Sequence, residues 1–393
     1  MTENETPARL IRMGMVGGGI GSFIGAVHRM AAALDGKIIL VCGVFSSEAK
    51  KSTISGLELG VHPTRIYHTF QEMIEKESLL PMNERMELMS VVTPNHVHYE
   101  PIKLGLEAGF HVICDKPLCF NLTQAYELKK IVQKSKRVFA ITHNYTGYPM
   151  VKQAKYMVQT GKLGKITKVV TEYAQGWLTT AIEKEGQKQA AWRTDPTKSG
   201  IAGAIGDIGT HAENLSRYIS GLEIEAMCAD IGTVVEGRNL DDDGNILLRY
   251  TSGARGVLYA SQISAGEENN LKIRVYGDRG SLEWSQMTPN TLMVKWMDRP
   301  MQYYRTGSFD LCEQALKHSR LPAGHPEGYI EAFANIYRNV ALAIIHKEDS
   351  KKNILELYDY PDIDDGVKGM EFIHFAIQSG KDDYKWLKCV SRV

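Results

Sequence analysis

Two short stretches carry side chains that are suited to moving a proton. Lys116 lies in the run CDKP, after an apolar strand-like segment and directly before a proline. A lysine at the carboxyl edge of a parallel sheet can hydrogen-bond a substrate hydroxyl, and its charge lowers the pKa of that hydroxyl. In an exposed loop the same lysine would have no such role.

Asp207 and His211 form the second candidate pair. They are four residues apart in the segment 204–220, AIGDIGTHAENLSRYIS, which predicts an amphipathic helix. Residues four apart share one face of a helix. A carboxylate and an imidazole held together can act as an acid–base pair, although the same spacing also occurs in ordinary surface pairs.

A glycine-rich stretch near the N-terminus predicts a site for a dinucleotide. Residues 12–28, RMGMVGGGIGSFIGAVH, read as a strand, a tight turn and the start of a helix. Glycine lets backbone approach a pyrophosphate closely, and the N–H groups at the helix start favour the anion. Gly17 and Gly19 occupy the first two positions of G-x-G-x-x-G, while Ser22 stands at the third. Gly25 takes the place of the third glycine of the motif if residues 20–22 lengthen the loop. Similar turns also occur in flavoproteins and methyltransferases.

The elements around these stretches alternate along the first part of the chain. We expect strands at 11–16, 38–44, 87–93, 111–114 and 138–142, and helices at 24–33, 48–59, 69–76, 97–108 and 122–134. Short apolar strands joined by helices predict a parallel sheet covered on both faces. Ligands of such sheets bind beyond the carboxyl ends of the strands. Residues 1–143 are therefore predicted to form a Rossmann domain that binds NAD or NADP.

The loop after the second strand bears on the choice between these cofactors. An NAD enzyme usually has an acidic residue there for the ribose hydroxyls, whereas this chain has Ser46 and Ser47 before Glu48. Serine leaves room for a 2′-phosphate that Lys50 or Lys51 could pair, and Glu48 could instead reach the ribose. A serine that caps the next helix explains the sequence equally well. Both cofactors stay open.

The pattern changes at residue 144. A helix at 150–159 and an alternating strand at 166–175 are followed by the weakly periodic stretch 177–204. Residues 224–296 are strand-rich with hairpin turns, and helices are expected at 309–318, 328–346 and 367–379. Residues 144–393 thus predict a C-terminal α+β domain with a large, mostly antiparallel sheet. Its candidates for binding a substrate are Asn144, Tyr145, Trp192, Arg193 and His325.

The composition excludes several classes of protein. The 393 residues hold 46 Lys and Arg and 46 Asp and Glu, so no charge excess favours nucleic acid or an anionic membrane. The six cysteines show no metal-binding spacing and are interpreted as buried free thiols, and no metal site is expected. The N-terminus is polar, and no apolar run approaches the roughly 20 residues that span a bilayer. We expect a cytoplasmic protein.

Together these motifs resemble the glucose–fructose oxidoreductase / inositol dehydrogenase (Gfo/Idh/MocA) family. FIGAVH at 23–28 matches the second half of the family's opening motif, with three extra residues after Gly19. Thr93, Asn95 and His98 lie in the motif T-P-N-x-x-H. DKP at 115–117 replaces E-K-P, and D-x-G-x-H is intact at 207–211. The motifs follow the family's order over nearly the whole chain.

The resemblance implies a Rossmann domain, a C-terminal domain with a mostly antiparallel sheet, and an active site between them. It also implies a homo-oligomer, a dimer or a tetramer. The longer members that act on sugars, glycosides or cyclitols share stretches like GHPEGYIEAFANIYRN, found here from Gly324. The cofactor-binding residues expected from the loop and the family motifs are Gly17, Gly19, Phe23, Ile24, Ser46, Thr93, Asn95, His98 and Lys116.

The predicted activity is an NAD(P)-dependent oxidation of a secondary alcohol of a sugar, glycoside or inositol, or the reverse reduction. His211 would take the hydroxyl proton, Lys116 would stabilise the oxygen, and Asp207 would position His211 or hold a neighbouring hydroxyl. An uncharged substrate is favoured, although Arg193 could bind a carboxylate. The alternatives are a dihydrodiol-type dehydrogenase and a non-catalytic regulator that binds NAD(P) and sugar. A regulator has no need of Lys116 and His211.

Overall fold

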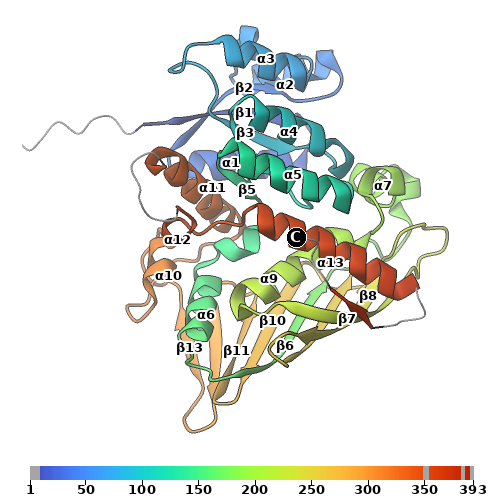
Figure 1. Ribbon diagram of the computed structural model, residues 1–393, viewed down its shortest axis with the longest axis vertical. Coiled ribbons are helices and arrows are strands. Elements are labelled where there is room, and N and C mark those ends of the chain that lie inside the picture. The colour runs from blue at the N-terminus through green and yellow to red at the C-terminus, as the bar shows by residue number, and fades with distance from the viewer. Residues whose placement is uncertain (1–8, 348–353, 382–385, 390–393) are drawn as a thin grey trace, which may run out of the picture.

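The computed structural model describes residues 9–347, 354–381 and 386–389, and the N-terminal part contains a five-stranded parallel sheet (Figure 1). The strand order is β2-β1-β3-β4-β5, so the order reverses between β1 and β3. The carboxyl ends of strands at such a reversal form a ligand crevice. The strands are β1 (Ile11–Gly17), β2 (Ile38–Val44), β3 (Leu88–Val92), β4 (His111–Cys114) and β5 (Phe139–Ile141).

Helices cover both faces of this sheet, as the predicted alternation requires. They are α1 (Phe23–Leu34), α2 (Ala49–Glu58), α3 (Phe70–Leu79), α4 (Tyr99–Glu107) and α5 (Leu122–Ser135). All five predicted strands and helices of this part are confirmed, with ends that differ by at most three residues. Neither Ser46 nor Ser47 caps α2, because its N-cap is Glu48, which makes no side-chain capping bond.

The C-terminal part is built on a nine-stranded sheet in the order β13-β12-β11-β10-β6-β9-β8-β7-β14. Within the described residues, β6 and β9 are the only parallel neighbours, so the predicted mostly antiparallel sheet is confirmed. The strands are β6 (Ile166–Ala174), β7 (Ile224–Gly232), β8 (Asp243–Tyr250), β9 (Arg255–Ser261), β10 (Asn270–Gly277), β11 (Gly280–Ser285), β12 (Thr291–Trp296), β13 (Gln302–Arg305) and β14 (Leu387–Lys388).

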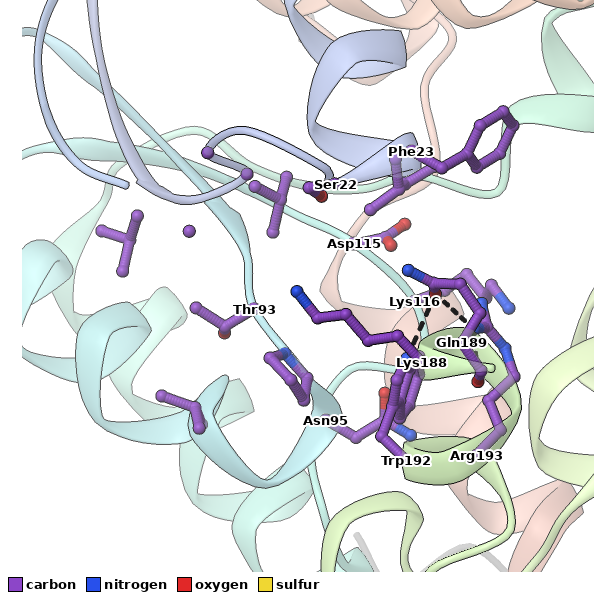
Figure 2. Close-up of a pocket in the computed structure, with 18 of the residues that line it drawn as sticks. Ser22, Phe23, Thr93, Asn95, Asp115, Lys116, Lys188, Gln189, Trp192 and Arg193 are labelled. Atoms are coloured by element: carbon purple, nitrogen blue, oxygen red, sulfur yellow. Dashed lines mark hydrogen bonds between the residues drawn. The ribbon is translucent and has the colours of Figure 1, made fainter. Parts of the chain in front are cut away.

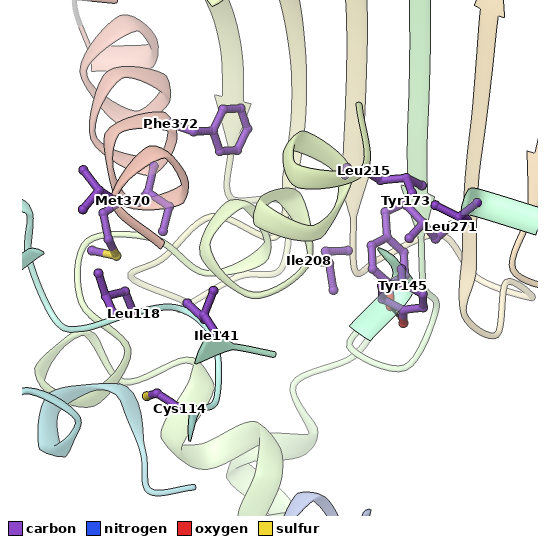
Figure 3. Close-up of a cluster of buried hydrophobic side chains, with 14 of the residues drawn as sticks. Cys114, Leu118, Ile141, Tyr145, Tyr173, Ile208, Leu215, Leu271, Met370 and Phe372 are labelled. Atoms are coloured by element: carbon purple, nitrogen blue, oxygen red, sulfur yellow. Dashed lines mark hydrogen bonds between the residues drawn. The ribbon is translucent and has the colours of Figure 1, made fainter. Parts of the chain in front are cut away.

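Helices pack on one face of this sheet, between it and the N-terminal part (Figure 1). They are α6 (Pro149–Gln159), α9 (Thr210–Ser220) and α13 (Ile363–Lys381). Figure 3 shows the buried side chains that join the layers, from Cys114 and Leu118 near β4 to Ile208 and on to Leu271 of β10. This continuous core fixes the carboxyl edge of the parallel sheet against the C-terminal helices.

One late helix returns to the N-terminal sheet. The helix α11 (Tyr329–His346) packs against α1, and its Phe333 and Tyr337 share a core with Met13 and Leu88. The predicted division at residue 143 thus describes the order of segments along the chain, while α11 lies with the first segment in space. The predicted helix at 309–318 is shorter, as α10 (Glu313–Lys317).

The predicted helix at 204–220 is present, but its N-terminal part is π-helical and not α-helical. A π-helical segment, η5 (Ile205–Gly209), precedes α9. The buried carboxylate of Asp241 accepts hydrogen bonds from the backbone N–H groups of Gly203 and Ile205 at 2.6 and 2.7 Å. This anchor comes from a distant loop, so the apolar spacing of the segment could not indicate the wider turn. Such π segments are frequent at functional sites.

Candidate functional site

A cleft of about 1510 Å³ lies between the two parts of the chain. Its walls are the glycine loop, the carboxyl ends of the parallel strands, and residues of the C-terminal part that include Asp207 and His211. Single ligands usually occupy pockets of about 300–1000 Å³, so this cleft has room for a dinucleotide and a small second molecule.

The glycine loop fits a pyrophosphate. Gly17 and Gly18 adopt φ values of +87° and +73°, which favour glycine. A Cβ on Gly25 would lie 2.3 Å from the Cα of Gly18, so loop and helix touch at a distance only glycine allows. Gly25 therefore takes the third glycine position, and Ser22 caps α1 by accepting from the N–H of Gly25. No acidic residue in the first turn of α1 opposes an anion.

The loop after β2 forms the far end of the cleft. Ser46, Glu48 and Lys51 line it, and the Nζ of Lys51 lies 2.5 Å from Oε1 of Glu48. Both charged side chains are exposed. A carboxylate at this place can accept from the two ribose hydroxyls of an NAD, so Glu48 fits the unphosphorylated ribose.

The T-P-N-x-x-H motif divides between two roles. Thr93 and Asn95 line the cleft, and the amide of Asn95 donates to the carbonyl of Ser199 at 3.2 Å. His98 is fully buried outside the cleft, with its ring nitrogens 2.7 and 2.9 Å from the carbonyl oxygens of Thr93 and Pro117. His98 thus ties two loops together, while His96 lines the cleft in its place.

Lys116 and Asp207 meet at the centre of the cleft. The Nζ of Lys116 donates to Oδ1 of Asp207 at 2.7 Å and to its backbone carbonyl at 2.6 Å. The Nε of Arg193 and the amide of Gln262 donate to Oδ2 at 3.0 and 2.9 Å. Burial alone would raise the pKa of Asp207, but Lys116 and Arg193 outweigh it and hold this pKa well below its usual range. Asp207 is therefore an ionised carboxylate that accepts from three side chains.

His211 lies beside this cluster and lines the same cleft. Its ring packs edge-on against Tyr145 and His143, with centroids 4.9 and 5.4 Å apart. Burial, with the nearby Lys116 and His143, lowers the pKa of His211 well below its ordinary value. At neutral pH the imidazole is uncharged and can accept a proton.

A polar network covers the C-terminal wall of the cleft. The hydroxyls of Tyr145 and Tyr173 are 2.5 Å apart, and both contact Asn269. The amide of Gln175 donates to Asn269 at 2.7 Å. Tyrosine and amide groups of this kind can donate to and accept from several hydroxyls of one ligand.

The helix α7 (Lys188–Arg193) forms part of the cleft wall, and Figure 2 shows its Gln189, Trp192 and Arg193 close together near Lys116. The guanidinium of Arg193 lies 4.3 Å from the ring centre of Trp192 and 5.8 Å from that of Trp177. Its Nη1 donates to Oε1 of Gln189 at 2.7 Å. Arg193 is thus already bonded to groups of the protein.

Most of the predicted site residues come together, and two do not. Asn144 is buried in the cleft wall, with an amide nitrogen that has no partner. His325 is exposed in the turn before α11 and does not line the cleft. His98 does not line the cleft either, since it is buried behind the cleft wall. The predicted residues that line the cleft are Gly17, Gly19, Phe23, Ile24, Ser46, Thr93, Asn95, Lys116, Asn144, Tyr145, Trp192, Arg193, Asp207 and His211.

Other residues of the cleft escaped the sequence analysis. Most of them lie at strand ends, in turns or in the short helix α7, where no motif marks them; only His96 and Asp115 fall within the motif stretches at 93–98 and 115–117. The polar and aromatic ones closest to the predicted residues are His96, Asp115, Thr142, Tyr173, Gln175, Trp177, Lys188, Gln189, Asn269 and Gln286.

The residues that the structure describes contain neither a candidate metal site nor a membrane-spanning helix. Among those residues, no group of three or more His, Cys, Asp or Glu could hold a metal ion. No helix in the same ranges is both long and apolar enough to cross a membrane.

Comparison with known proteins matches two consecutive parts of the chain. Residues 11–143 match an oxidoreductase family with an NAD-binding Rossmann fold, and residues 151–283 match the GFO/IDH/MocA C-terminal domain. The uncharacterized oxidoreductase YfiI of Bacillus subtilis (strain 168) is 34% identical over 384 residues, which cover 96% of each chain.

Solved structures agree with this assignment. An oxidoreductase from Sinorhizobium meliloti is 44% identical with a TM-score of 0.87, over 97% of this chain and 100% of that one. An inositol dehydrogenase homolog from Azotobacter vinelandii, complexed with NAD+, is 36% identical with a TM-score of 0.93, over 97% and 98% of the two chains. The same homolog complexed with NADH and myo-inositol matches at 35% identity and a TM-score of 0.90, over 97% and 98%. The present chain belongs to the GFO/IDH/MocA family of oxidoreductases, and its N-terminal part is an NAD-binding Rossmann domain.

Proposed function

We propose that the protein is an NAD(P)-dependent oxidoreductase that oxidises a secondary alcohol of an uncharged sugar, glycoside or inositol, or reduces the corresponding ketone. One observation carries this proposal: Lys116 and His211 line the same cleft as the glycine loop. In this proposal His211 accepts a proton and Lys116 stabilises an oxygen, and both lie next to the part of the cleft that would hold the nicotinamide cofactor. When bound, the nicotinamide ring accepts or donates the hydride.

His211 takes the proton of the substrate hydroxyl. Its uncharged imidazole suits this role, because a base must be deprotonated before the reaction. In the reverse direction the protonated ring returns the proton to the ketone oxygen. General acid–base help of this kind contributes about 10²–10⁴ in rate.

Lys116 stabilises the same oxygen. An ammonium group has three N–H donors, and two of them go to the carboxylate and the carbonyl of Asp207. The third is free to point at a substrate oxygen. In this proposal Asp207 therefore orients Lys116, and His211 alone accepts the hydroxyl proton.

The charges of the cleft favour an uncharged substrate. Lys116 and Arg193 are both bonded to Asp207, and the wall beyond them offers amides and tyrosine hydroxyls, as at Asn269 and Tyr145. A sugar acid or sugar phosphate would have to displace Arg193 from its protein partners. The homolog crystallised with NADH and myo-inositol supports a cyclitol or a similar ring as substrate.

The test begins with fluorescence titrations of the wild-type protein with NADH and with NADPH. A panel of uncharged polyols and of matching sugar acids and phosphates is then followed at the nicotinamide absorbance. The proposal predicts cofactor reduction by at least one uncharged ring polyol and none by the charged analogues. Cofactor binding without turnover of any polyol, or of a dihydrodiol added to the panel, would contradict it and support a non-catalytic regulator. Turnover confined to acids would exclude the uncharged substrate.

A further inference from the structure

A second buried imidazole lies behind His211. His143 follows β5 and is 2% exposed, compared with 7% for His211. The two rings are nearly perpendicular, at 87°, with centroids 5.4 Å apart. His143 does not line the cleft, so a substrate in the cleft contacts His211 and not His143.

Both rings have an unsatisfied nitrogen. The Nδ1 atoms of His143 and His211 are buried and have no hydrogen-bond partner. A buried polar atom without a partner costs about 1–3 kcal/mol. His318 shows the usual arrangement: it is equally buried, and its ring nitrogens lie 2.6 and 2.8 Å from Gln314 and Asn339. Two unpaired nitrogens on adjacent rings therefore indicate a bond that the site makes at another stage.

We propose that His143 is a positioning residue for His211, whose Nδ1–H donates a hydrogen bond to the Nδ1 of His143. This bond holds the tautomer of His211 in which Nε2 carries a lone pair for the substrate proton. The same bond stabilises the imidazolium that forms when that proton arrives. The inference rests on the proposed function, since it assigns His211 as the base.

The arrangement follows the general logic of an oriented base. A catalytic imidazole needs a third group on its far nitrogen to set its tautomer and ring orientation. In this structure the carboxylate of Asp207 accepts from Lys116, Arg193 and Gln262, and it does not satisfy the Nδ1 of His211, which has no partner. Catalytic hydrogen bonds are often long in a free enzyme and tighten with substrate. This agrees with two adjacent rings whose Nδ1 atoms have no partner in the structure.

Charged groups surround His143 on three elements. Burial is the main cause that lowers the pKa of His143 to about 3; Arg217 of α9 and Lys116 add to this shift, while Asp365 of α13 and Asp115 oppose it. The ring of His143 therefore stays uncharged near neutral pH. An uncharged ring can accept a hydrogen bond, whereas a protonated ring would repel the imidazolium of His211.

The first test reads the tautomer without catalysis. The imidazole nitrogens of protein labelled with 15N-histidine are measured by NMR at neutral pH, with His211→Asn used to assign the signals. We expect His211 to be protonated at Nδ1 in the wild type and in His143→Asn, whose amide oxygen replaces the acceptor. In His143→Leu we expect the Nε2-protonated form to increase. An Nε2-protonated His211 in the wild type, or a tautomer unaffected by His143→Leu, would overturn the inference.

The second test separates positioning from stability. We expect kcat of His143→Leu to fall about 10- to 100-fold, as for other groups that orient a functional histidine. KM and NADH affinity should stay within about twofold. His143→Asn should regain most of kcat, and His318→Asn should lose thermal stability but keep kcat and its pH profile. Equal losses in the Leu and Asn variants, or wild-type kcat in His143→Leu, would contradict the role.

The two tests fail separately. If the wild-type protein turns over no polyol, the proposed function fails, and the NMR measurement still decides whether His143 sets the tautomer of His211. If the wild type is active but His143→Leu keeps the wild-type rate, pH profile and tautomer, only the inference about His143 fails.

Discussion

The Nζ of Lys116 lies 2.7 Å from Oδ1 of Asp207, and this ion pair joins the loop after β4 to the π-helical segment before α9. The two residues come from different parts of the chain and line one cleft. Asp207 also accepts from Arg193 and Gln262. The pair therefore sets the position of the Lys116 ammonium relative to His211.

Replacing the carboxylate of Asp207 tests this relationship. We expect Asp207→Asn to lower kcat about 100-fold, because the amide cannot hold Lys116 by charge and it adds N–H donors opposite Lys116 and Arg193. NADH affinity should hardly change. Steady-state kinetics and a fluorescence titration measure the two quantities. Asp195→Asn is the control, since Asp195 pairs with Lys198 outside this cluster. A kcat of Asp207→Asn near that of the control would contradict the role.

Gly25 tests the glycine loop. In Gly25→Ala the new Cβ would lie 2.3 Å from the Cα of Gly18, so loop and helix must move apart. Overpacking of this kind costs about 1–3 kcal/mol, and we expect NADH affinity to fall at least about tenfold, measured by titration. Gly232→Ala is the control, because a Cβ there meets nothing within 4 Å. Unchanged NADH affinity in Gly25→Ala would show that the loop does not hold the pyrophosphate.

Glu48 tests the preference for NAD. Glu48 lies in the loop after β2, as the N-cap of α2, where its carboxylate can accept from the ribose hydroxyls. Hydrogen bonds to charged groups contribute about 1.5–3 kcal/mol. We expect Glu48→Ala to weaken NADH binding about 10-fold or more and to weaken NADPH binding less. Glu58→Ala replaces an exposed residue at the C-terminal end of α2, and it should change the affinity for neither cofactor. Equal effects on both cofactors would exclude a ribose contact.

The fold was predictable where burial imposes a pattern. The strands β1, β3 and β4 are buried on both faces or nearly so, and their apolar runs, as in residues 11–16 and 111–114, marked them within two residues. The alternation of 166–175 likewise marked β6, because one face of that strand is packed and the other is not. Local periodicity is enough for such elements, since each carries its own pattern of burial.

The site was predictable only where a short motif carries the chemistry. Lys116, Asp207 and His211 lie in recognisable stretches of the sequence. The pairing of β6, β9 and β10, in contrast, brings Asn269 to the cleft and Gln262 to the carboxylate of Asp207. No local spacing indicates that convergence. The two histidines of the loop after β3 show the same limit, because His96 lines the cleft and His98 is buried behind it. The sequence could not indicate which ring points inward.

Buried histidines predict a loss of stability in acid. Burial lowers the pKa of His111, His143 and His318 to about 3 from an ordinary 6.5. Below about pH 6.5 these histidines bind protons in the unfolded chain but not in the folded chain. The free energy of unfolding therefore decreases as the pH is lowered from about 6.5 to about 3. Each such group contributes up to about 1.4 kcal/mol per pH unit. Asp241 and Asp362 oppose the trend between about pH 6 and 4, because burial raises each pKa to about 6.

Thermal unfolding at several pH values measures this balance. We expect the midpoint temperature of unfolding to fall as the pH is lowered from about 7 to about 5, since the histidines outnumber the opposing aspartates. His318→Gln should be less stable at neutral pH and should show a shallower pH dependence, because it removes one of the buried imidazoles. His374→Gln, on an exposed side chain of α13, should keep the wild-type slope. A midpoint that rises toward pH 5 would contradict the account.

The most direct measurement of the central claim is hydride transfer by His211→Asn with the polyol that the wild type oxidises best. The account predicts a kcat at least about 100-fold lower than wild type, with NADH affinity unchanged, because only the proton acceptor is lost. His374→Asn should match the wild type in both quantities. A His211→Asn protein that turns over the same polyol at a wild-type rate would show that His211 is not the base and that the cleft works by another chemistry.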